Sequence, residues 1–190
     1  MKQMLLCLLA TIVWQTPLPA QTGSNLVLAA EVFANGKTYK LSPTASERAA
    51  GKYDCSSFVQ SVLKKEGFNV GGSTGNKINI VLSEADKSKL KELVEASDKK
   101  IKGVVSALVE SNQGSEISSI TNLRAGDIIQ LWRISGGTPK GHTAIVKSIN
   151  AETKKVMLVG AHNPTDGVGE KEFVLNETGW PIWFGVRPSK

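Results

Sequence analysis

The chain has 190 residues, with 23 lysines and arginines against 17 aspartates and glutamates, and a formal net charge of +6. Hydrophobic residues make up 41% and charged residues 21%, a balance typical of globular proteins that excludes a disordered chain. The length suits one domain with enough residues to bury a real core.

The first twenty residues have the pattern of a secretory signal peptide. Lys2 gives a positive start, residues 4–14 are almost wholly apolar, and residues 17–20 (PLPA) supply a helix break and a small residue for cleavage. The apolar stretch is too short to span a bilayer. We therefore expect an exported protein, periplasmic or extracellular, without a stable membrane anchor. Cleavage removes Lys2 and Cys7, which lowers the net charge to +5 and leaves Cys55 as the only cysteine.

Helices are predicted for the next part of the chain. Residues 26–33 form an apolar run that indicates a first helix, and residues 44–50 (TASERAA) predict a short helical turn. From Asp54 onward the apolar residues fall on one helical stripe, which ends at Gly67. The glycines of residues 71–75 predict a flexible loop.

Two more helices are predicted after this loop, at about 83–97 and 98–112, with Gly114 as a C-cap. The lysines of this region alternate with acidic residues, so they predict a solvated face and no nucleic-acid partner.

From Gly126 the apolar pattern changes to the two-residue period of β-strands. Helices followed by an antiparallel sheet predict an α+β fold rather than an alternating parallel sheet. We expect one domain over residues 21–190. Five strands are predicted, at residues 127–134, 142–149, 155–161, 170–175 and 182–187.

Cys55 is the candidate nucleophile. It falls in the first turn of a predicted helix, where unpaired N–H groups and the helix dipole favour a thiolate and are expected to lower the pKa of the thiol. A thiolate there can attack an amide carbonyl, and the N–H groups of the same turn can donate to the resulting oxyanion. The alternative is a structural thiol, because free cysteines are often buried.

The two histidines of the chain suit the roles of base and orienting group. His142 opens a predicted strand and can reach a helix N-terminus packed on the sheet. His162 ends the next strand, so in an antiparallel pair both lie at one sheet edge, and His162 can bond the far nitrogen of His142. The alternative for each is a strand-end histidine satisfied by the backbone. One cysteine and two histidines could also bind zinc, but no zinc-type spacing is present, so we expect no metal and no cofactor.

Five segments then occur in a recognisable order: residues 53–59 (YDCSSFV), 123–129 (LRAGDII), 141–146 (GHTAIV), 159–162 (VGAH) and 184–187 (FGVR). Together they resemble the NlpC-type cysteine peptidases, bacterial enzymes that cut peptidoglycan stem peptides. The resemblance implies a papain-like fold, with the nucleophile at a helix N-terminus packed on an antiparallel sheet of about five strands. Compared with the family pattern, the helical stretch at about 83–112 resembles an insertion between nucleophile and base, which would either wall the cleft and set specificity or block access and regulate.

The resemblance also assigns roles to individual residues. It implies a Cys-His-His triad in which Cys55 is the nucleophile, His142 the base and His162 the orienting group. It implies that Asp54 and Ser56 line the subsite for the amino end of the stem peptide. Through the segment GKTY, it implies that Tyr39 helps to bind the oxyanion; the alternative is an ordinary core or surface aromatic.

The implied function is a secreted cysteine hydrolase that cleaves amide bonds in peptidoglycan stem peptides, with peptidoglycan peptide as its partner. The small positive charge fits an anionic wall polymer. Residues 141–146 also resemble the histidine strand of the cysteine- and histidine-dependent amidohydrolases (the CHAP group), which implies an N-acetylmuramoyl-L-alanine amidase as an alternative. A non-catalytic wall-binding or inhibitory module on the same fold is another, and a toxin against rival cells would share the chemistry.

Overall fold

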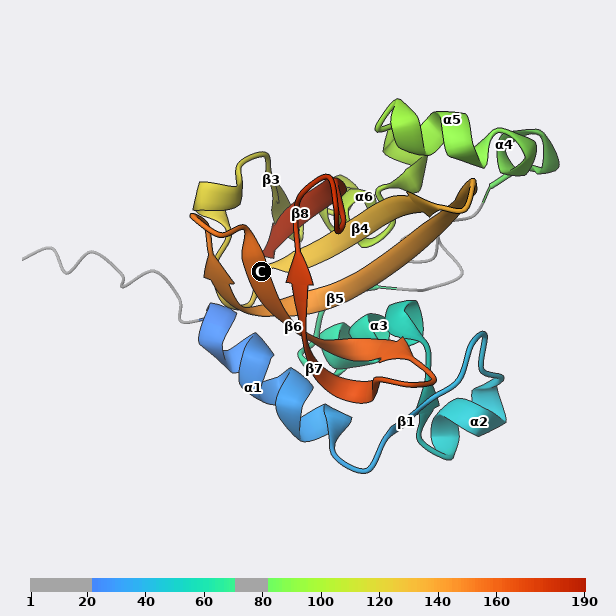
Figure 1. Ribbon diagram of the computed structural model, residues 1–190. Helices are drawn as coiled ribbons and strands as arrows, with labels where there is room; N and C mark the ends of the chain where they lie inside the picture. Colours follow the sequence, from blue (N-terminus) through green and yellow to red (C-terminus); the bar gives the residue numbers. More distant parts are fainter. Residues whose placement is uncertain (1–21, 71–81) are drawn as a thin grey trace, which may run out of the picture.

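The computed structural model describes residues 22–70 and 82–190, so the predicted signal peptide and the predicted loop at residues 71–75 lie outside the described residues. The described ranges form six α-helices, a six-stranded antiparallel sheet and a small two-stranded sheet (Figure 1). The fold is therefore α+β, as the order of the predicted elements indicates. Among these helices none combines the length and the apolar character needed to cross a membrane.

The large sheet holds the five predicted strands and one more. The additional strand pairs Gly114–Ile117 with the C-terminal strand, so Gly114 starts a strand and is not the predicted helix cap. Its sequence GSEI shows no apolar alternation, and its pairing is decided by a partner about 70 residues away. Across the sheet the strands are β3 (Gly114–Ile117), β8 (Ile182–Pro188), β4 (Ile128–Ser135), β5 (Thr138–Asn150), β6 (Lys155–Asn163) and β7 (Gly167–Val174).

The first three helices agree with the predicted positions: α1 (Thr22–Ala34), α2 (Ala45–Ala49) and α3 (Cys55–Lys65). Helix α3 begins where Asp54 caps it, and its buried face lies against β5 and β6 (Figure 1). That face consists of residues at helical spacing, each wholly removed from solvent: Phe58, Val59, Val62 and Leu63.

The predicted insertion is more broken than its apolar pattern suggests. It is divided into four pieces by breaks at Lys89, at residues 96–98 and at Gly103, whose φ of +50° suits glycine. A hydrogen bond joins the insertion to the sheet, because the indole N–H of Trp132 on β4 donates to the Ile101 carbonyl at 2.9 Å. In Figure 1 the first two pieces extend away from the sheet. The pieces are α4 (Glu84–Ser88), α5 (Leu90–Glu95), the 3₁₀ turn η1 (Lys99–Ile101) and α6 (Val104–Glu110).

Hydrophobic residues fill both faces of the large sheet. On β5, Ile145 belongs to the cluster that contains α1, α3 and α6, whereas Ala144 belongs to the cluster on the other face. This alternation follows from the two-residue period of a strand. The partly buried side chains of Ile120, Ile149, Trp180 and Trp183 pack against the second cluster.

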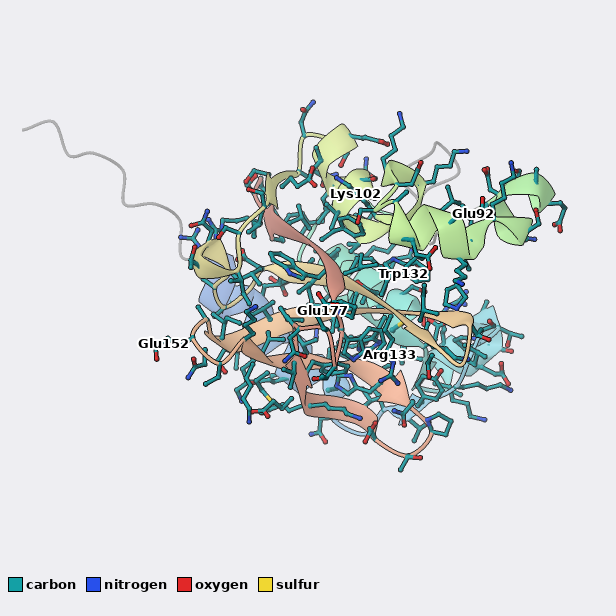
Figure 2. All side chains as sticks on the ribbon, turned by 45° about the horizontal axis from the view of Figure 1, so that its top comes forward. Glu92, Lys102, Trp132, Arg133, Glu152 and Glu177 are labelled. Carbon is teal, nitrogen blue, oxygen red and sulfur yellow. The ribbon has the colours of Figure 1, made fainter. Side chains whose placement is uncertain are left out.

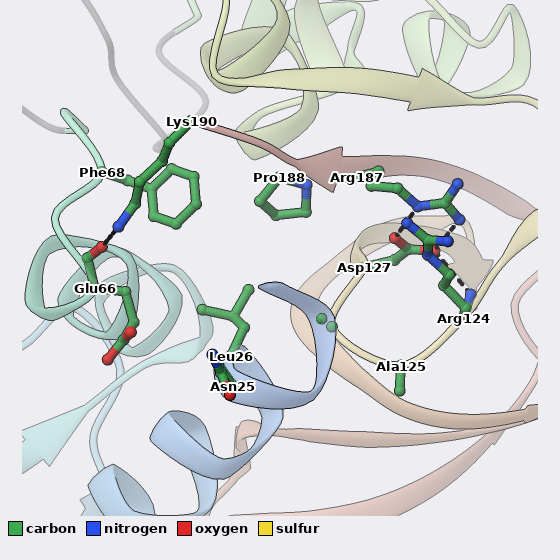
Figure 3. A pocket seen from close by; sticks show the side chains of 12 residues that line it. Asn25, Leu26, Glu66, Phe68, Arg124, Ala125, Asp127, Arg187, Pro188 and Lys190 are labelled. Atoms are coloured by element: carbon green, nitrogen blue, oxygen red, sulfur yellow. Dashed lines mark hydrogen bonds and ion pairs between the residues drawn. The ribbon is translucent and has the colours of Figure 1, made fainter. Parts of the chain in front are cut away.

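A buried ion pair joins β8 to the start of β4. The side chain of Asp127 is only 2% exposed and accepts two hydrogen bonds from the Arg187 guanidinium, each of 3.0 Å (Figure 3). The neighbouring turn contacts the start of α1, where a Cβ on Gly126 would lie 2.2 Å from the Cα of Gly23. Gly126 also has φ of +86°, so both its position and its conformation require glycine.

The two-stranded sheet brings a distant segment beside α3. Strand β1 (Thr38–Tyr39) pairs in parallel with β2 (Lys52–Tyr53), which places Tyr39 opposite Tyr53. Because β2 leads directly into α3, this pairing positions Tyr39 near the start of that helix.

Candidate active site

The thiol of Cys55 lies at the first residue of α3, against strand β5. Burial raises the pKa of this thiol, and the charge of Asp54 raises it further. Hydrogen bonding from the backbone of Thr143, Ser56 and Cys55 itself acts in the opposite direction. The expectation of a lowered pKa was therefore wrong, because desolvation outweighs the donors at the helix start. The resting thiol is protonated at neutral pH.

Asp54 is occupied as the helix cap. Its Oδ1 accepts the backbone N–H of Ser57 at 2.8 Å and the hydroxyls of Ser57 and Ser56 at 2.6 and 3.2 Å. Its Oδ2 accepts the backbone N–H of Ser42 at 3.2 Å. Ser57 completes a capping box by accepting the Asp54 N–H at 3.0 Å. Asp54 and Ser56 thus lie beside Cys55, as a substrate subsite there requires, but both already hold hydrogen bonds that define the helix start.

Tyr39 lies near the thiol, as its pairing with Tyr53 predicts. Burial raises the pKa of the Tyr39 hydroxyl, and negative charge on Cys55 or Asp54 raises it further. A phenol with a raised pKa remains a hydrogen-bond donor over the whole neutral range. The structure therefore brings together Tyr39, Asp54, Cys55 and Ser56.

His142 and His162 form a directed pair. His142 Nε2 lies 3.1 Å from His162 Nδ1, and His162 Nε2 lies 2.9 Å from the carbonyl oxygen of Gly169. Because a carbonyl only accepts, His162 donates from Nε2, and its neutral ring accepts at Nδ1. His142 must then donate from Nε2, which leaves Nδ1 of His142 as a free acceptor. The hydrogen bond expected at the far nitrogen of His142 is present.

The pair is shielded from water by two aromatic rings. Phe173 stacks on His142, with ring centres 5.2 Å apart and planes 13° apart, and Trp180 lies 6.2 Å away. Burial, assisted by the nearby His162 and Lys171 charges, lowers the pKa of His142 to about 3. Burial also lowers the pKa of His162, although the Gly169 carbonyl acts in the other direction. Both imidazoles are neutral at neutral pH.

The thiol of Cys55 and the histidine pair both lie beside strand β5. His142 shares a sheet face with its cross-strand partner Leu131, opposite the face that packs on α3. Across residues 22–70 and 82–190, no hydrogen bond joins the thiol to either imidazole. The contact of Cys55 is with the backbone of Thr143, the residue after His142.

A cavity of about 410 Å³ opens beside the two histidines. Its described lining contains no residue of the insertion at 83–112, so that insertion does not wall this cavity. A second cavity, of about 120 Å³, lies between α1 and the C-terminal end of β8, and its lining includes no cysteine or histidine (Figure 3). The larger cavity is lined by Arg133, Lys140, Gly141, His142, His162, Asn163, Lys171, Glu172, Phe173, Val174, Gly179 and Trp180.

Sequence reasoning missed several residues of the site. Ser57 was detectable, because an Asp followed three residues later by a hydroxyl residue at a helix start is a capping pattern. Gly169, Phe173 and Trp180 carry no such local signal, since their roles depend on strand pairing and on a loop that folds back. Within the part of the chain that the structure describes, no three metal-ligating side chains gather at one point.

No family model matches the chain, and no curated protein matches it.

Proposed function

We propose that the protein is an exported, papain-like cysteine hydrolase that cleaves amide bonds in peptidoglycan stem peptides. The observation that carries the proposal is the chain of hydrogen bonds from Gly169 through His162 to His142. It leaves Nδ1 of His142 as an acceptor, and the backbone of the next residue, Thr143, contacts the Cys55 thiol. The ordered segments that resemble the NlpC-type peptidases support the same chemistry.

The reaction begins with two neutral groups. Substrate binding has to bring the thiol and Nδ1 of His142 into contact, because no hydrogen bond joins them in the described structure. Cys55 Sγ then attacks the carbonyl carbon of the scissile amide while its proton passes to Nδ1 of His142. The imidazolium that forms keeps its hydrogen bond from Nε2 to His162. The oxyanion is stabilised by N–H groups at the start of α3, with the Tyr39 hydroxyl as a further donor.

The intermediate then collapses. His142 returns its proton to the amide nitrogen, the C–N bond breaks, and the amine leaves while a thioester remains on Cys55. Water attacks the thioester carbonyl and gives a proton to His142. The C–S bond breaks, the thiolate takes that proton back, and the acid product leaves. Because burial disfavours both charged forms, proton transfer accompanies the attack and no thiolate precedes it.

Export of the protein is proposed from the residues of the predicted signal peptide. The substrate class is proposed from the resemblance to the NlpC-type peptidases. A cationic cavity next to His142 supports an anionic substrate. The CHAP-like alternative uses the same thiol chemistry and differs in the bond, which would be the muramoyl–alanine link.

A specific observation favours one competitor, the non-catalytic wall-binding or inhibitory module. The thiol is desolvated and has no hydrogen bond to an imidazole in the described structure. Such a thiol would also suit a protein that only holds a wall peptide.

Digestion of purified peptidoglycan separates these proposals. The protein purified after export, Cys55→Ala and Cys55→Ser are each incubated with the polymer, and soluble products are identified by mass spectrometry. Fragments from the native protein alone are the expected result, and their masses distinguish a cut within the stem peptide from an amidase cut. Equal absence of fragments in all three, with retention of the protein on sedimented peptidoglycan, would support the binding module instead.

A further inference from the structure

Two positive charges stand directly opposite each other on the hairpin that carries His142. Arg133 of β4, which is labelled in Figure 2, and Lys140 of β5 are cross-strand partners. Both residues are exposed. Paired residues of an antiparallel ladder share a face, where like charges destabilise the pair. This arrangement is unfavourable unless a negative group lies between the two side chains.

Within the described structure, no carboxylate neutralises these two cations. Across the described ranges, neither Arg133 nor Lys140 forms an ion pair. The other charges of the cavity already have partners, because Lys171 contacts Asp166 and Glu172 lies 2.9 Å from Lys155. The cavity therefore keeps a net positive charge from the opposed pair.

The guanidinium of Arg133 is held in place by an aromatic ring. Its central carbon lies 4.7 Å from the ring centre of Trp180, a residue that also lies 6.2 Å from His142. Stacking on a ring leaves the N–H donors at the guanidinium edge available. The Trp180 ring thus lies close both to the Arg133 guanidinium and to His142, the proposed base.

The proposed reaction brings the amine half of the substrate to this cavity, whose described lining includes His142 but not Cys55. In the proposed reaction His142 gives its proton to the leaving nitrogen, so that nitrogen has to contact His142. Lys140 and His142 are two residues apart on β5, share one face of the strand and both line the cavity. A group bonded to the leaving nitrogen would therefore extend toward Lys140 and Arg133.

We propose that Arg133 and Lys140 bind a carboxylate carried by the amine half of the substrate, next to the scissile bond. Arginine offers a planar pair of donors to the two carboxylate oxygens, and lysine adds a point charge. The inference rests on the proposed function and deepens it, since it selects amide bonds whose leaving residue has a free acid group.

The test uses two synthetic stem tripeptides with the same scissile bond. In one, the leaving residue ends in a free carboxylate; in the other, that carboxylate is a carboxamide. Binding is measured calorimetrically with Cys55→Ala and with Cys55→Ala combined with Arg133→Gln and Lys140→Gln. Lys64→Gln/Lys65→Gln in the same background is the matched control, because it removes two charges at the far end of α3 from Cys55. Turnover is measured with the native cysteine.

We expect Cys55→Ala to bind the peptide with the free carboxylate about 10- to 100-fold more tightly than the peptide with the carboxamide. This ratio corresponds to the free energy of hydrogen bonds to a charged group. The preference should vanish in the Arg133→Gln/Lys140→Gln variant and persist in the control. Equal binding of the two peptides, or a preference that survives the double substitution, would overturn the carboxylate subsite. Turnover without a preference would retain the hydrolase and reject the subsite. A binding preference without any turnover would reject the hydrolase and retain a carboxylate-binding cavity.

Discussion

His142 Nε2 lies 3.1 Å from His162 Nδ1, and this hydrogen bond decides which nitrogen of His142 is the acceptor. The direction of the bond comes from Gly169, whose carbonyl oxygen obliges His162 to donate from its other nitrogen. A residue seven positions from His162 therefore determines the tautomer of the proposed base. Adjacent pairing of β5 with β6, and of β6 with β7, makes the relay possible.

Removal of the relay should impair turnover more than binding. His162→Ala deletes the acceptor that orients His142, so we expect kcat to fall by about 10²- to 10⁴-fold with little change in KM. His162→Asn provides an amide oxygen that can accept the same proton and should recover part of the loss. Steady-state hydrolysis of a stem peptide is the measurement. Wild-type kcat in His162→Ala would contradict the relay.

The charge of Asp54 should hold down the reactivity of Cys55. Asp54→Asn keeps a residue that caps helices well but removes the negative charge that raises the pKa of the thiol. The midpoint pH of iodoacetamide alkylation should therefore move down in this variant. Asp98→Asn makes the same change at the cap of η1 and serves as control. A midpoint that is the same in all three proteins would show that Asp54 does not influence the thiol.

Stability should fall in acid because His142 is buried in its neutral form. Its pKa is about 3 in the folded protein and near 6.5 in the unfolded chain, so between these values the unfolded chain binds the extra proton. The free energy of unfolding then decreases as the pH falls from 6.5 toward 3, by up to about 1.4 kcal/mol per pH unit. Urea unfolding of wild type and His142→Gln across pH 7 to 4 measures this slope. Equal slopes in the two proteins would refute the assignment to His142.

Removal of the Trp180 ring should move the pKa of His142 toward neutrality. Burial is the largest cause of the lowered pKa, and Trp180 contributes to that burial on the cavity side. Trp180→Ala should therefore raise the pKa of His142 and shift the acid limb of the kcat/KM profile to higher pH. Trp183→Ala is the control, because Trp183 packs on the same cluster but does not line this cavity. An unshifted acid limb in Trp180→Ala would exclude the shielding role.

The ion pair between Asp127 and Arg187 should contribute to the free energy of unfolding and not to catalysis. Arg187→Ala leaves a nearly inaccessible carboxylate without its cation, which we expect to cost about 3 kcal/mol in the free energy of unfolding. Arg124→Ala should cost little, because Arg124 bonds Asp127 through its backbone N–H. Urea titration of both variants checks the difference. Equal destabilisation would contradict this division.

Local patterns predicted most elements, but not those that depend on distant partners. The stripe from Phe58 to Leu63 and the alternation around Ile145 are periodic within a few residues, so helix α3 and strand β5 were recognisable. Strand β3 was missed because its four residues are defined by pairing with β8. The continuous helices predicted for the insertion were wrong at Gly103, where a positive φ interrupts the pattern.

The sequence by itself determined the reagents and their order: a cysteine at a helix start and two histidines on consecutive strands. The prediction that His142 opens its strand was wrong, because β5 begins at Thr138 and His142 lies inside it. It also determined the α+β class, because backbone hydrogen bonding imposes periods that the side chains must follow. Only the tertiary structure decided the protonation of these reagents. Desolvation by Phe173, Trp180 and the packed strands lowers the pKa of His142, and burial against β5 raises that of Cys55. Burial depends on contacts between segments far apart in the chain, so no local pattern reports it.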